Sequence, residues 1–272
     1  MYSGLAISSK NSGRIFGVHQ KIDRVAYNNL GRLPGEQPWF PDIKQILHFE
    51  GLNGPDGLKK KSPAKDEPWH YIDPTNPNDK AILSIISDHS RQLSRALKQK
   101  NPSRAAFEAA WLSHAVVDGL TPAHHYPYEV KLAELRGGEG LETRTTIRKK
   151  WFMTGETAGQ KIQNNWKAWG PNGLFITHSS FEAGVAAIIA FMSLKSALPT
   201  AAEMAEFQRL GCEQWFLKLA KEVAELDLFE KFVSRGWSER LARQVQVDLI
   251  PLLVKAIVVV WHGAAELAAK AK

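Results

Sequence analysis

The sequence of 272 residues contains a single cysteine, Cys212, and this scarcity limits the chemistry open to the protein. One cysteine cannot form an internal disulfide framework, and it cannot supply a zinc site built from several thiolates. Any metal ligands must therefore be imidazoles and carboxylates. The chain contains both, with nine histidines and 28 aspartates and glutamates.

Long apolar runs are also missing. The N-terminal segment MYSGLAISSKNSGRIFG lacks the continuous apolar stretch of a signal peptide. The most apolar segment, 249–261, contains Pro251 and Lys255. The sequence therefore predicts a buried core helix there and no membrane-spanning helix. The localisation and the oligomeric state stay open.

The charge is weighted toward one sign, with 35 lysines and arginines and a formal net charge of +7. Such an excess suits an anionic partner, for example a phosphate ester, a membrane surface or a nucleic acid. Surface lysines that keep a protein soluble explain the same excess equally well. Charge alone therefore does not choose among these partners.

Strand signals are scarce, and helical periodicity dominates instead. Residues 14–30 carry apolar side chains at three- and four-residue steps, which predicts an amphipathic helix. Residues 51–78 are rich in Gly, Pro, Asn and Asp, which predicts a loop. The other predicted helices are 79–99, 103–119, 142–152, 156–168, 175–194, 200–223, 226–234, 237–247 and 250–269.

The chain shows no internal repeat and no low-complexity linker, so the simplest architecture is a single all-α domain over residues 1–272. Residues 126–177 form an insert in this prediction, and residues 195–272 supply the C-terminal helices.

One stretch, HAVVDGLTPAHHYPYE at 114–129, is crowded with side chains that bind metals. His114 and Asp118 stand four residues apart, which places them on one face of a helix. Pro122 follows, so the helix is expected to end near Gly119 and the chain to bring His124 back toward the pair. Taken alone, such a pair is more often a solvated ion pair or a buried core histidine.

Two further clusters strengthen the metal interpretation. His70 lies in PWHYIDP, fourteen residues after Asp56 in NGPDG, and THSSFEAG holds His178 and Glu182 four residues apart. Imidazole combined with carboxylate is a ligand set that suits zinc. Two ligands one helical turn apart are also the device of known zinc motifs. His19 adds an imidazole near the apolar face of the first helix.

In this order of residues the sequence resembles the zinc-dependent phospholipase C family, which shares an all-helical fold with the fungal single-strand-specific nucleases. HAVVDGLTPAHH is similar to the helix-turn motif of the family, and WHYIDP is similar to its His-aromatic-x-Asp-Pro loop. The resemblance covers roughly residues 14–190. Asp42 in WFPD is a second candidate for the loop carboxylate, and the spacing to His70 favours Asp56.

The resemblance implies two to three zinc ions and assigns eight residues to them. The implied ligand sets are Asp56, His70, His114 and Asp118 for the first ion, His124, His178 and Glu182 for the second, and His19 with a bridging Asp118 for the third. Asp56 also takes the role of general base. Close-set zinc ions lower the pKa of bound water toward ~7 and polarise phosphoryl oxygens.

The function implied is that of a zinc-dependent phosphodiesterase, a phospholipase C acting on phospholipid headgroups with peripheral membrane contact. Glu182 favours it, because in this superfamily the last ligand pair tends to be His-x-x-x-Glu in phospholipases and His-x-x-x-Asp in nucleases. One alternative is a nuclease or nucleotidase of the same fold. Another is a non-catalytic protein that keeps the metal for stability.

The chain departs from the family pattern in two places. A processed N-terminal tryptophan completes the third zinc site in the family, whereas no tryptophan precedes His19 here, so we expect this site to be the weakest. The insert 126–177 is longer than expected and carries RTTIRKKW, Trp166 and Trp169. It is either a lid or membrane-facing surface, or a set of solvated helices with tryptophans in the core, and we favour the latter. For Lys59–Lys61 a solvated loop is the simpler interpretation.

Overall fold

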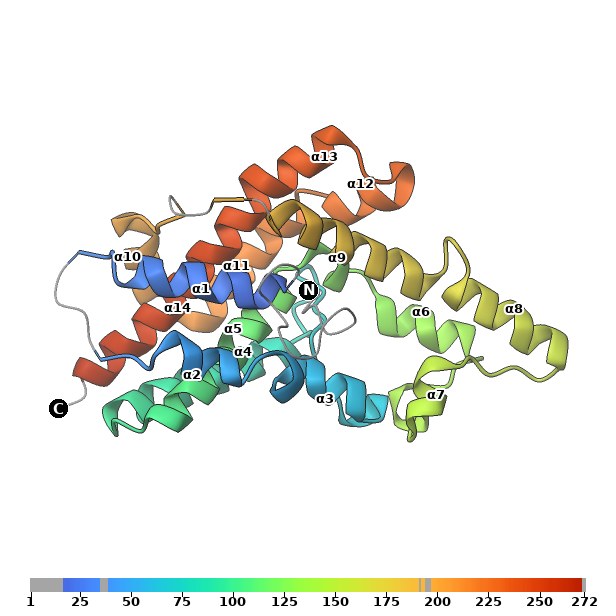
Figure 1. Ribbon diagram of the computed structural model, residues 1–272. Helices are drawn as coiled ribbons and strands as arrows, with labels where there is room; N and C mark the ends of the chain where they lie inside the picture. Colours follow the sequence, from blue (N-terminus) through green and yellow to red (C-terminus); the bar gives the residue numbers. More distant parts are fainter. Residues whose placement is uncertain (1–16, 35–38, 191, 194–196, 271–272) are drawn as a thin grey trace.

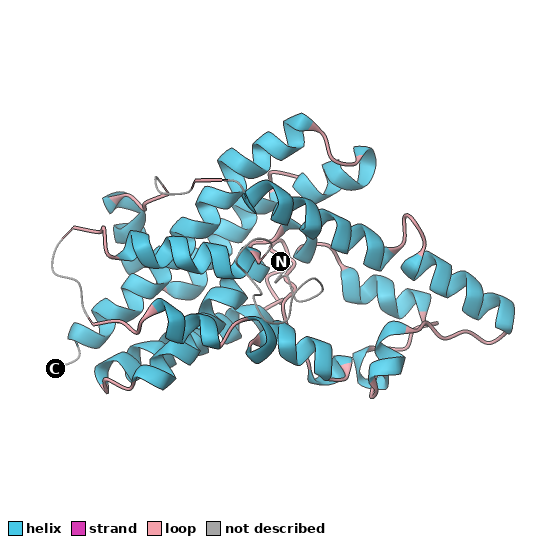
Figure 2. Ribbon diagram, viewed as in Figure 1, coloured by secondary structure: helices cyan, strands magenta, loops and turns pink. Residues whose placement is uncertain are grey.

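The computed structural model describes residues 17–34, 39–190, 192–193 and 197–270. Within these ranges the chain is helical, and no strand occurs among them (Figure 2). The prediction of an all-α fold is confirmed. The assignment to the phospholipase C and nuclease type stays a prediction.

The helices of the described chain range from single turns to the 21 residues of the last one. In chain order they are α1 (Val18–Leu30), α2 (Ile43–His48), η1 (Gly51–Asn53), α3 (Pro55–Lys61), η2 (Ala64–Asp66), α4 (Ala81–Lys98), α5 (Pro102–Gly119), η3 (Pro122–His124), α6 (Tyr128–Leu135), η4 (Leu141–Thr143), α7 (Ile147–Trp151), α8 (Ala158–Trp169), α9 (Leu174–Ala190), α10 (Ala201–Leu210), α11 (Cys212–Ala224), α12 (Leu228–Arg235), α13 (Glu239–Gln244), η5 (Val245–Leu249) and α14 (Ile250–Lys270).

The main bundle is built around α5 and α14, which pack against each other and against α4, while α1 packs on both (Figure 1). The apolar stretch 256–261 of α14 is entirely buried, as predicted for a core helix. Trp261 completes this contact, because its indole N–H donates to the carbonyl oxygen of Ala109 at 3.0 Å. One hydrophobic cluster contains residues from Val18 in α1 to Ala265 in α14.

Helix α5 can occupy the centre of the bundle because of its sequence. Asn101 caps its first turn by accepting a hydrogen bond from the Arg104 amide at 3.0 Å, and Pro102 stands at the first helical position, where it needs no donor. Small side chains let neighbouring helices approach closely, and Ala105 and Ala109 are fully buried. A helix so deeply packed carries its last turn into the interior.

The last two predicted helices form one continuous helix. The sequence predicted a break between 247 and 250, but α13 runs through the π-helical turn η5 directly into α14. Pro251 lies in the first turn after η5. A proline inside a helix removes one backbone donor, and a π turn is one of the local adjustments that tolerate it. The predicted break was therefore wrong.

Three other element predictions need correction. The loop predicted at 51–78 contains α3, whose start has Pro55 at the first position and Asp56 in the first turn, both favourable at a helix N-terminus. Helices α2 and α6 were not predicted. The helix predicted over 200–223 divides at Gly211, whose φ of 75° lies in the left-handed region that glycine tolerates. The helix predicted over residues 14–30 corresponds to α1, which begins at Val18. The predicted residues 14–16 lie outside the described part of the chain.

The insert folds around its own small core and projects from the bundle as α6, α7 and α8 (Figure 1). This second cluster contains Tyr128, Leu132, Met153, Ala168 and Phe175. The expectation that the tryptophans of this segment are buried was wrong, since the exposed fraction of Trp166 is 68% and that of Trp169 is 41%.

Two helical stretches of the described chain reach the length and apolar composition of a membrane span. They are Ala158–Ala190 and Glu239–Lys270, with 33% and 67% of the apolar window buried. The sequence predicted no uncharged apolar run long enough to span a membrane, and these stretches qualify only with charged residues such as Glu182 and Lys255 included, so that prediction is not overturned. The second stretch is a core helix of the bundle, so length and composition alone are weak support for a membrane span.

The close contact at the end of α5 gives a stability prediction. A Cβ atom added at Gly119 would lie 2.6 Å from Phe216 Cζ and 2.9 Å from Ile82 Cδ1, and both of these side chains are fully buried. Gly119→Ala should lower the free energy of unfolding by about 1–3 kcal/mol in a denaturant titration, since overpacking a core costs this much.

Gly159→Ala is the matched control, because the nearest atom to its added Cβ lies at 4.0 Å on exposed α8. An equal loss in both variants would contradict the packing at the end of α5.

Candidate metal centre

The last turn of α5 places two predicted ligands side by side in the protein interior. His114 is 2% exposed and Asp118 is 0% exposed, and His114 Nε2 lies 3.4 Å from Asp118 Oδ2. An ion pair on a solvated surface would expose both groups. The alternative of a surface ion pair therefore does not hold.

Helix α1 adds His19 to this pair. Its ring stacks on the ring of His114 with centroids 3.9 Å apart and an interplanar angle of 3°. His19 Nε2 lies 3.3 Å from Asp118 Oδ1. The two carboxylate oxygens of Asp118 therefore face different imidazoles, as a carboxylate must when it bridges two ions.

Helix α3 brings Asp56 and Lys59 to the same carboxylate. Asp56 Oδ1 lies 3.7 Å from His114 Nε2, and the Lys59 ammonium lies 3.4 Å from Asp56 Oδ1 and 3.0 Å from Asp118 Oδ2. The interpretation of Lys59 as a solvated loop residue was wrong. Its ammonium stands between two of the carboxylates that the resemblance assigns to the first zinc.

Glu50 is a member of the site that the sequence analysis missed. It is 4% exposed, and its Oε2 lies 3.3 Å from His114 Nδ1, while its Oε1 meets no hydrogen-bond partner in the described part of the chain. Ligand atoms of His19, Glu50 and His114 all lie within 4.8 Å of one another, a group that could hold a metal ion. No motif surrounds Glu50 in the sequence, so only the fold reveals it.

A second group that could hold a metal ion consists of His124, His178 and Glu182, whose ligand atoms also lie within 4.8 Å of one another. Glu182 Oε1 lies 3.0 Å from His124 Nε2 and 3.2 Å from His178 Nε2. The i,i+4 pair on α9 thus meets the histidine that follows α5.

The turn predicted after α5 brings His124 back to the centre. Thr121 Oγ1 donates to the Val117 carbonyl oxygen at 2.7 Å, and the His124 amide donates to the Thr121 carbonyl oxygen at 2.8 Å. This turn places His124 Nδ1 3.8 Å from Asp118 Oδ1. The two groups of ligands therefore adjoin at Asp118.

His70 lies at the edge of the centre rather than within either group. Its ring centroid is 5.1 Å from that of His124, and its Nδ1–H donates to the Pro68 carbonyl oxygen at 3.0 Å. This bond leaves Nε2 as the nitrogen with a lone pair. Burial, together with the nearby charges of Lys59 and His124, lowers the pKa of His70 well below its usual value, which keeps the imidazole neutral.

The electrostatics of the centre favour cations. Burial opposes ionisation of Asp118, but the Lys59 ammonium and neighbouring imidazoles hold the pKa of that carboxyl well below its usual range. Burial likewise disfavours the imidazolium of His114, yet Asp118, Glu50 and Asp56 raise its pKa to about 10. Buried carboxylates that stay ionised need positive partners, and a divalent ion is one such partner.

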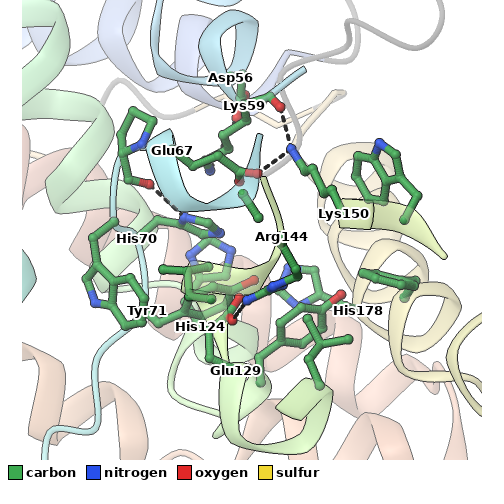
Figure 3. A pocket seen from close by; sticks show the side chains of 18 of the residues that line it. Asp56, Lys59, Glu67, His70, Tyr71, His124, Glu129, Arg144, Lys150 and His178 are labelled. Atoms are coloured by element: carbon green, nitrogen blue, oxygen red, sulfur yellow. Dashed lines mark hydrogen bonds and ion pairs between the residues drawn. The ribbon is translucent and has the colours of Figure 1, made fainter. Parts of the chain in front are cut away.

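A cavity of about 380 Å³ opens onto this centre, and Asp56, His70, His124 and His178 are among its lining residues (Figure 3). Five aromatic rings form part of its walls. The rings are those of Trp69, Tyr71, Tyr128, Trp151 and Phe175. The volume and the mixture of apolar walls with converging polar groups are typical of a small-molecule site.

Two cations from the insert stand on the wall of the cavity. Lys150 pairs with Glu67 and donates to the carbonyl oxygen of Lys59, and Arg144 pairs with Glu129 (Figure 3). The Lys150 contacts tie the insert to residues 59–67, whereas the Arg144–Glu129 pair lies within the insert. Both cations are nearly buried on the cavity wall.

The side chains of the centre fit a metal such as zinc, because they combine imidazole nitrogens with the oxygens of ionised carboxylates. Several buried ligand atoms have no hydrogen-bond partner within the described ranges. They are Glu50 Oε1, Asp56 Oδ2, His114 Nε2, His124 Nδ1 and His178 Nδ1. Buried polar atoms in such numbers call for an ion or water.

The position of Lys59 predicts a competition with metal ions. Lys59→Met removes a positive charge that lies between Asp56 and Asp118, and it should raise the affinity of the centre for Zn²⁺ at least ~10-fold in calorimetric titration. Lys60→Met is the matched control, since Lys60 is exposed on the same helix. An affinity equal to that of the unchanged protein would mean that the ammonium leaves the carboxylates when the metal binds.

A search of protein-family models and of curated proteins found no match to this chain. The geometry of the centre therefore carries the functional argument.

Proposed function

We propose that the protein is a zinc-dependent phosphodiesterase of the phospholipase C kind. The single observation that carries the proposal is the position of Asp118. Its two oxygens face His19 and His114 on α1 and α5, and His124 of the second ligand group lies beside it. One buried carboxylate shared in this way suits a centre of close-set ions rather than one isolated ion.

The chain divides its ligands between two positions. His114, Asp118, His19 and Asp56 would hold metal on the α5 side of the centre, with His70 at its edge. His124, His178 and Glu182 would hold metal on the α9 side, where the cavity opens. Bound zinc would supply a water of lowered pKa and polarise the phosphoryl oxygens.

Residues around the ligands orient the imidazoles. Glu50 accepts from His114 Nδ1, which turns Nε2 toward Asp56 and Asp118. The Pro68 carbonyl oxygen does the same for His70. A carboxylate or carbonyl behind a ligating histidine fixes its tautomer and increases its basicity, and the loss of such a partner commonly weakens metal binding 10–100-fold.

Asp56 is suited to the role of general base. Its Oδ1 is engaged by Lys59 and His114, whereas its Oδ2 has no hydrogen-bond partner in the described residues. The ammonium of Lys59 and the two imidazoles hold the pKa of this carboxyl below its usual value although burial raises it. An ionised oxygen on the cavity wall can accept a proton from an attacking water.

The cavity walls suit a phosphodiester with a bulky alcohol group. Lys59, Lys150 and Arg144 line it and can attract the phosphate charge, while the aromatic rings offer faces to the alcohol. Aromatic faces attract organic cations such as a quaternary ammonium headgroup. Together with the His-x-x-x-Glu pair, they favour a phospholipid as the substrate class.

A nuclease or nucleotidase is the second candidate, because nucleobases stack on the same rings. Comparing hydrolysis of a choline phosphodiester with that of single-stranded DNA by the zinc-loaded protein separates the two. Preferred cleavage of DNA would replace the first proposal by the second. Zinc binding without cleavage of either substrate would favour a non-catalytic metal protein.

The role of Asp118 gives the next prediction. Asp118→Asn keeps the size of the side chain but removes its charge, and it should lower both the zinc content and the hydrolytic rate by at least ~100-fold. The measurements are metal analysis by mass spectrometry and the phosphodiesterase assay. Asp88→Asn is the control, because Asp88 forms an exposed ion pair with Arg91 and is not one of the ligands. Normal zinc content and turnover in Asp118→Asn would rule out the shared carboxylate.

Metal removal should also loosen the fold. The ligands come from α1, α3, α5, η3 and α9, which adjoin only in the folded chain. A metal ion whose free concentration is 100 times its dissociation constant stabilises the folded state by about 2.7 kcal/mol. Removing the ion with a chelator should therefore lower Tm by roughly 5–10 °C. An unchanged Tm in calorimetry after verified removal of zinc would show that the ions do not tie these helices together.

A further inference from the structure

The arm formed by residues 147–169, which includes α7 and α8, exposes large apolar side chains. Ile162 is 72% exposed and Trp166 is 68% exposed, and Trp169 continues the same line on α8. These three residues follow one another at four- and three-residue steps, so they share one face of the helix. Phe152, which follows α7, is 60% exposed as well.

The orientation of α8 is fixed by polar contacts on its other side. Asn164 Nδ2 donates to the Thr154 carbonyl oxygen at 2.8 Å. Asn165 both donates to the Met153 carbonyl oxygen and accepts from its amide, each at 3.0 Å. The asparagines thus face inward while isoleucine and tryptophan face outward, the reverse of an ordinary surface helix. Exposure of the apolar face follows from specific bonds.

Basic side chains surround this face. The exposed residues Arg148, Lys149, Lys161 and Lys167 lie on the arm, and Glu156 is the only acidic residue of the segment 147–169. The apolar stripe is therefore bordered by positive charge. This combination complements a surface that is apolar inside and anionic at its boundary.

The arm also adjoins the cavity. Lys150 and Trp151 of α7 line the cavity wall, and the Trp169 indole N–H donates to the Trp151 carbonyl oxygen at 2.8 Å. Figure 1 shows α7 and α8 at the end of the molecule that projects from the bundle. A surface that met this end would lie beside the entrance to the metal centre.

We propose that the arm 147–169 docks on an anionic phospholipid bilayer. Tryptophan prefers the interface between headgroups and acyl chains, and Ile162 and Phe152 would enter the apolar layer while the lysines contact lipid phosphates. A nucleic acid would engage the aromatic rings and the lysines but has no use for an isoleucine that is 72% exposed in the same stripe. The docking goes beyond the proposed function and requires no hydrolysis.

Co-sedimentation with vesicles of phosphatidylcholine, with and without phosphatidylserine, tests the proposal. The unchanged protein should bind the vesicles that contain phosphatidylserine and lose this binding at high salt. The double variant Ile162→Ser/Trp166→Ser should bind at least ~10-fold more weakly. Lys161→Gln/Lys167→Gln should lose about 30-fold in affinity, since each lysine near an anionic surface contributes about a factor of five.

Leu267→Ser is the control, because Leu267 is equally exposed, at 57%, on α14 away from the arm. Circular dichroism checks that each variant is folded. No binding by the unchanged protein, or equal binding by the double variants, would overturn the docking surface. Binding to single-stranded DNA in place of vesicles, lost in the same variants, would also overturn it.

Asp118→Asn separates this inference from the proposed function. A variant without hydrolytic activity should still sediment with phosphatidylserine vesicles, because Asp118 is fully buried and far along the chain from the arm. Loss of vesicle binding in Asp118→Asn, with the fold retained, would contradict a docking surface independent of the metal centre.

Discussion

The charge of Asp118 is the constraint on which the rest of the centre depends. A fully buried carboxylate is stable only when positive or hydrogen-bonding partners surround it, and here those partners are His19, His114, His124 and Lys59. They come from α1, α5, η3 and α3. Satisfying one charge therefore fixes the mutual positions of four helical elements, and it does so at the end of the most deeply packed helix.

Lys59 shows how this charge can be balanced with fewer divalent ions. An ammonium has one positive charge and three donors, and it lies 3.0 Å and 3.4 Å from the Asp118 and Asp56 oxygens. Lys59 pairs with the two carboxylates of the α5 side, and its charge also interacts with Glu182 on α9. The direct competition between this ammonium and a divalent ion is therefore strongest at Asp56 and Asp118.

The parts of this molecule that could be predicted from sequence are those fixed by local spacing. The pair on α5, the turn that returns His124 and the pair on α9 each depend on residues within about ten positions of one another. Glu50 and Lys59 could not be assigned, because their roles arise from contacts across the fold. The prediction that the α8 tryptophans are buried failed for a related reason. Asn164 and Asn165 of this helix donate hydrogen bonds to the backbone of residues 153–154, and these contacts turn the tryptophans outward.

The small second core makes the insert a semi-independent unit. Tyr128, Met153 and Phe175 pack together apart from the main cluster. Lys150 connects the insert to α3 through a hydrogen bond to the Lys59 carbonyl oxygen, and to the following loop through its ion pair with Glu67. The helices α5 and α1, which carry His114, Asp118 and His19, pack in the main core, so the Asp118 carboxylate and the insert side of the cavity wall rest on different hydrophobic clusters.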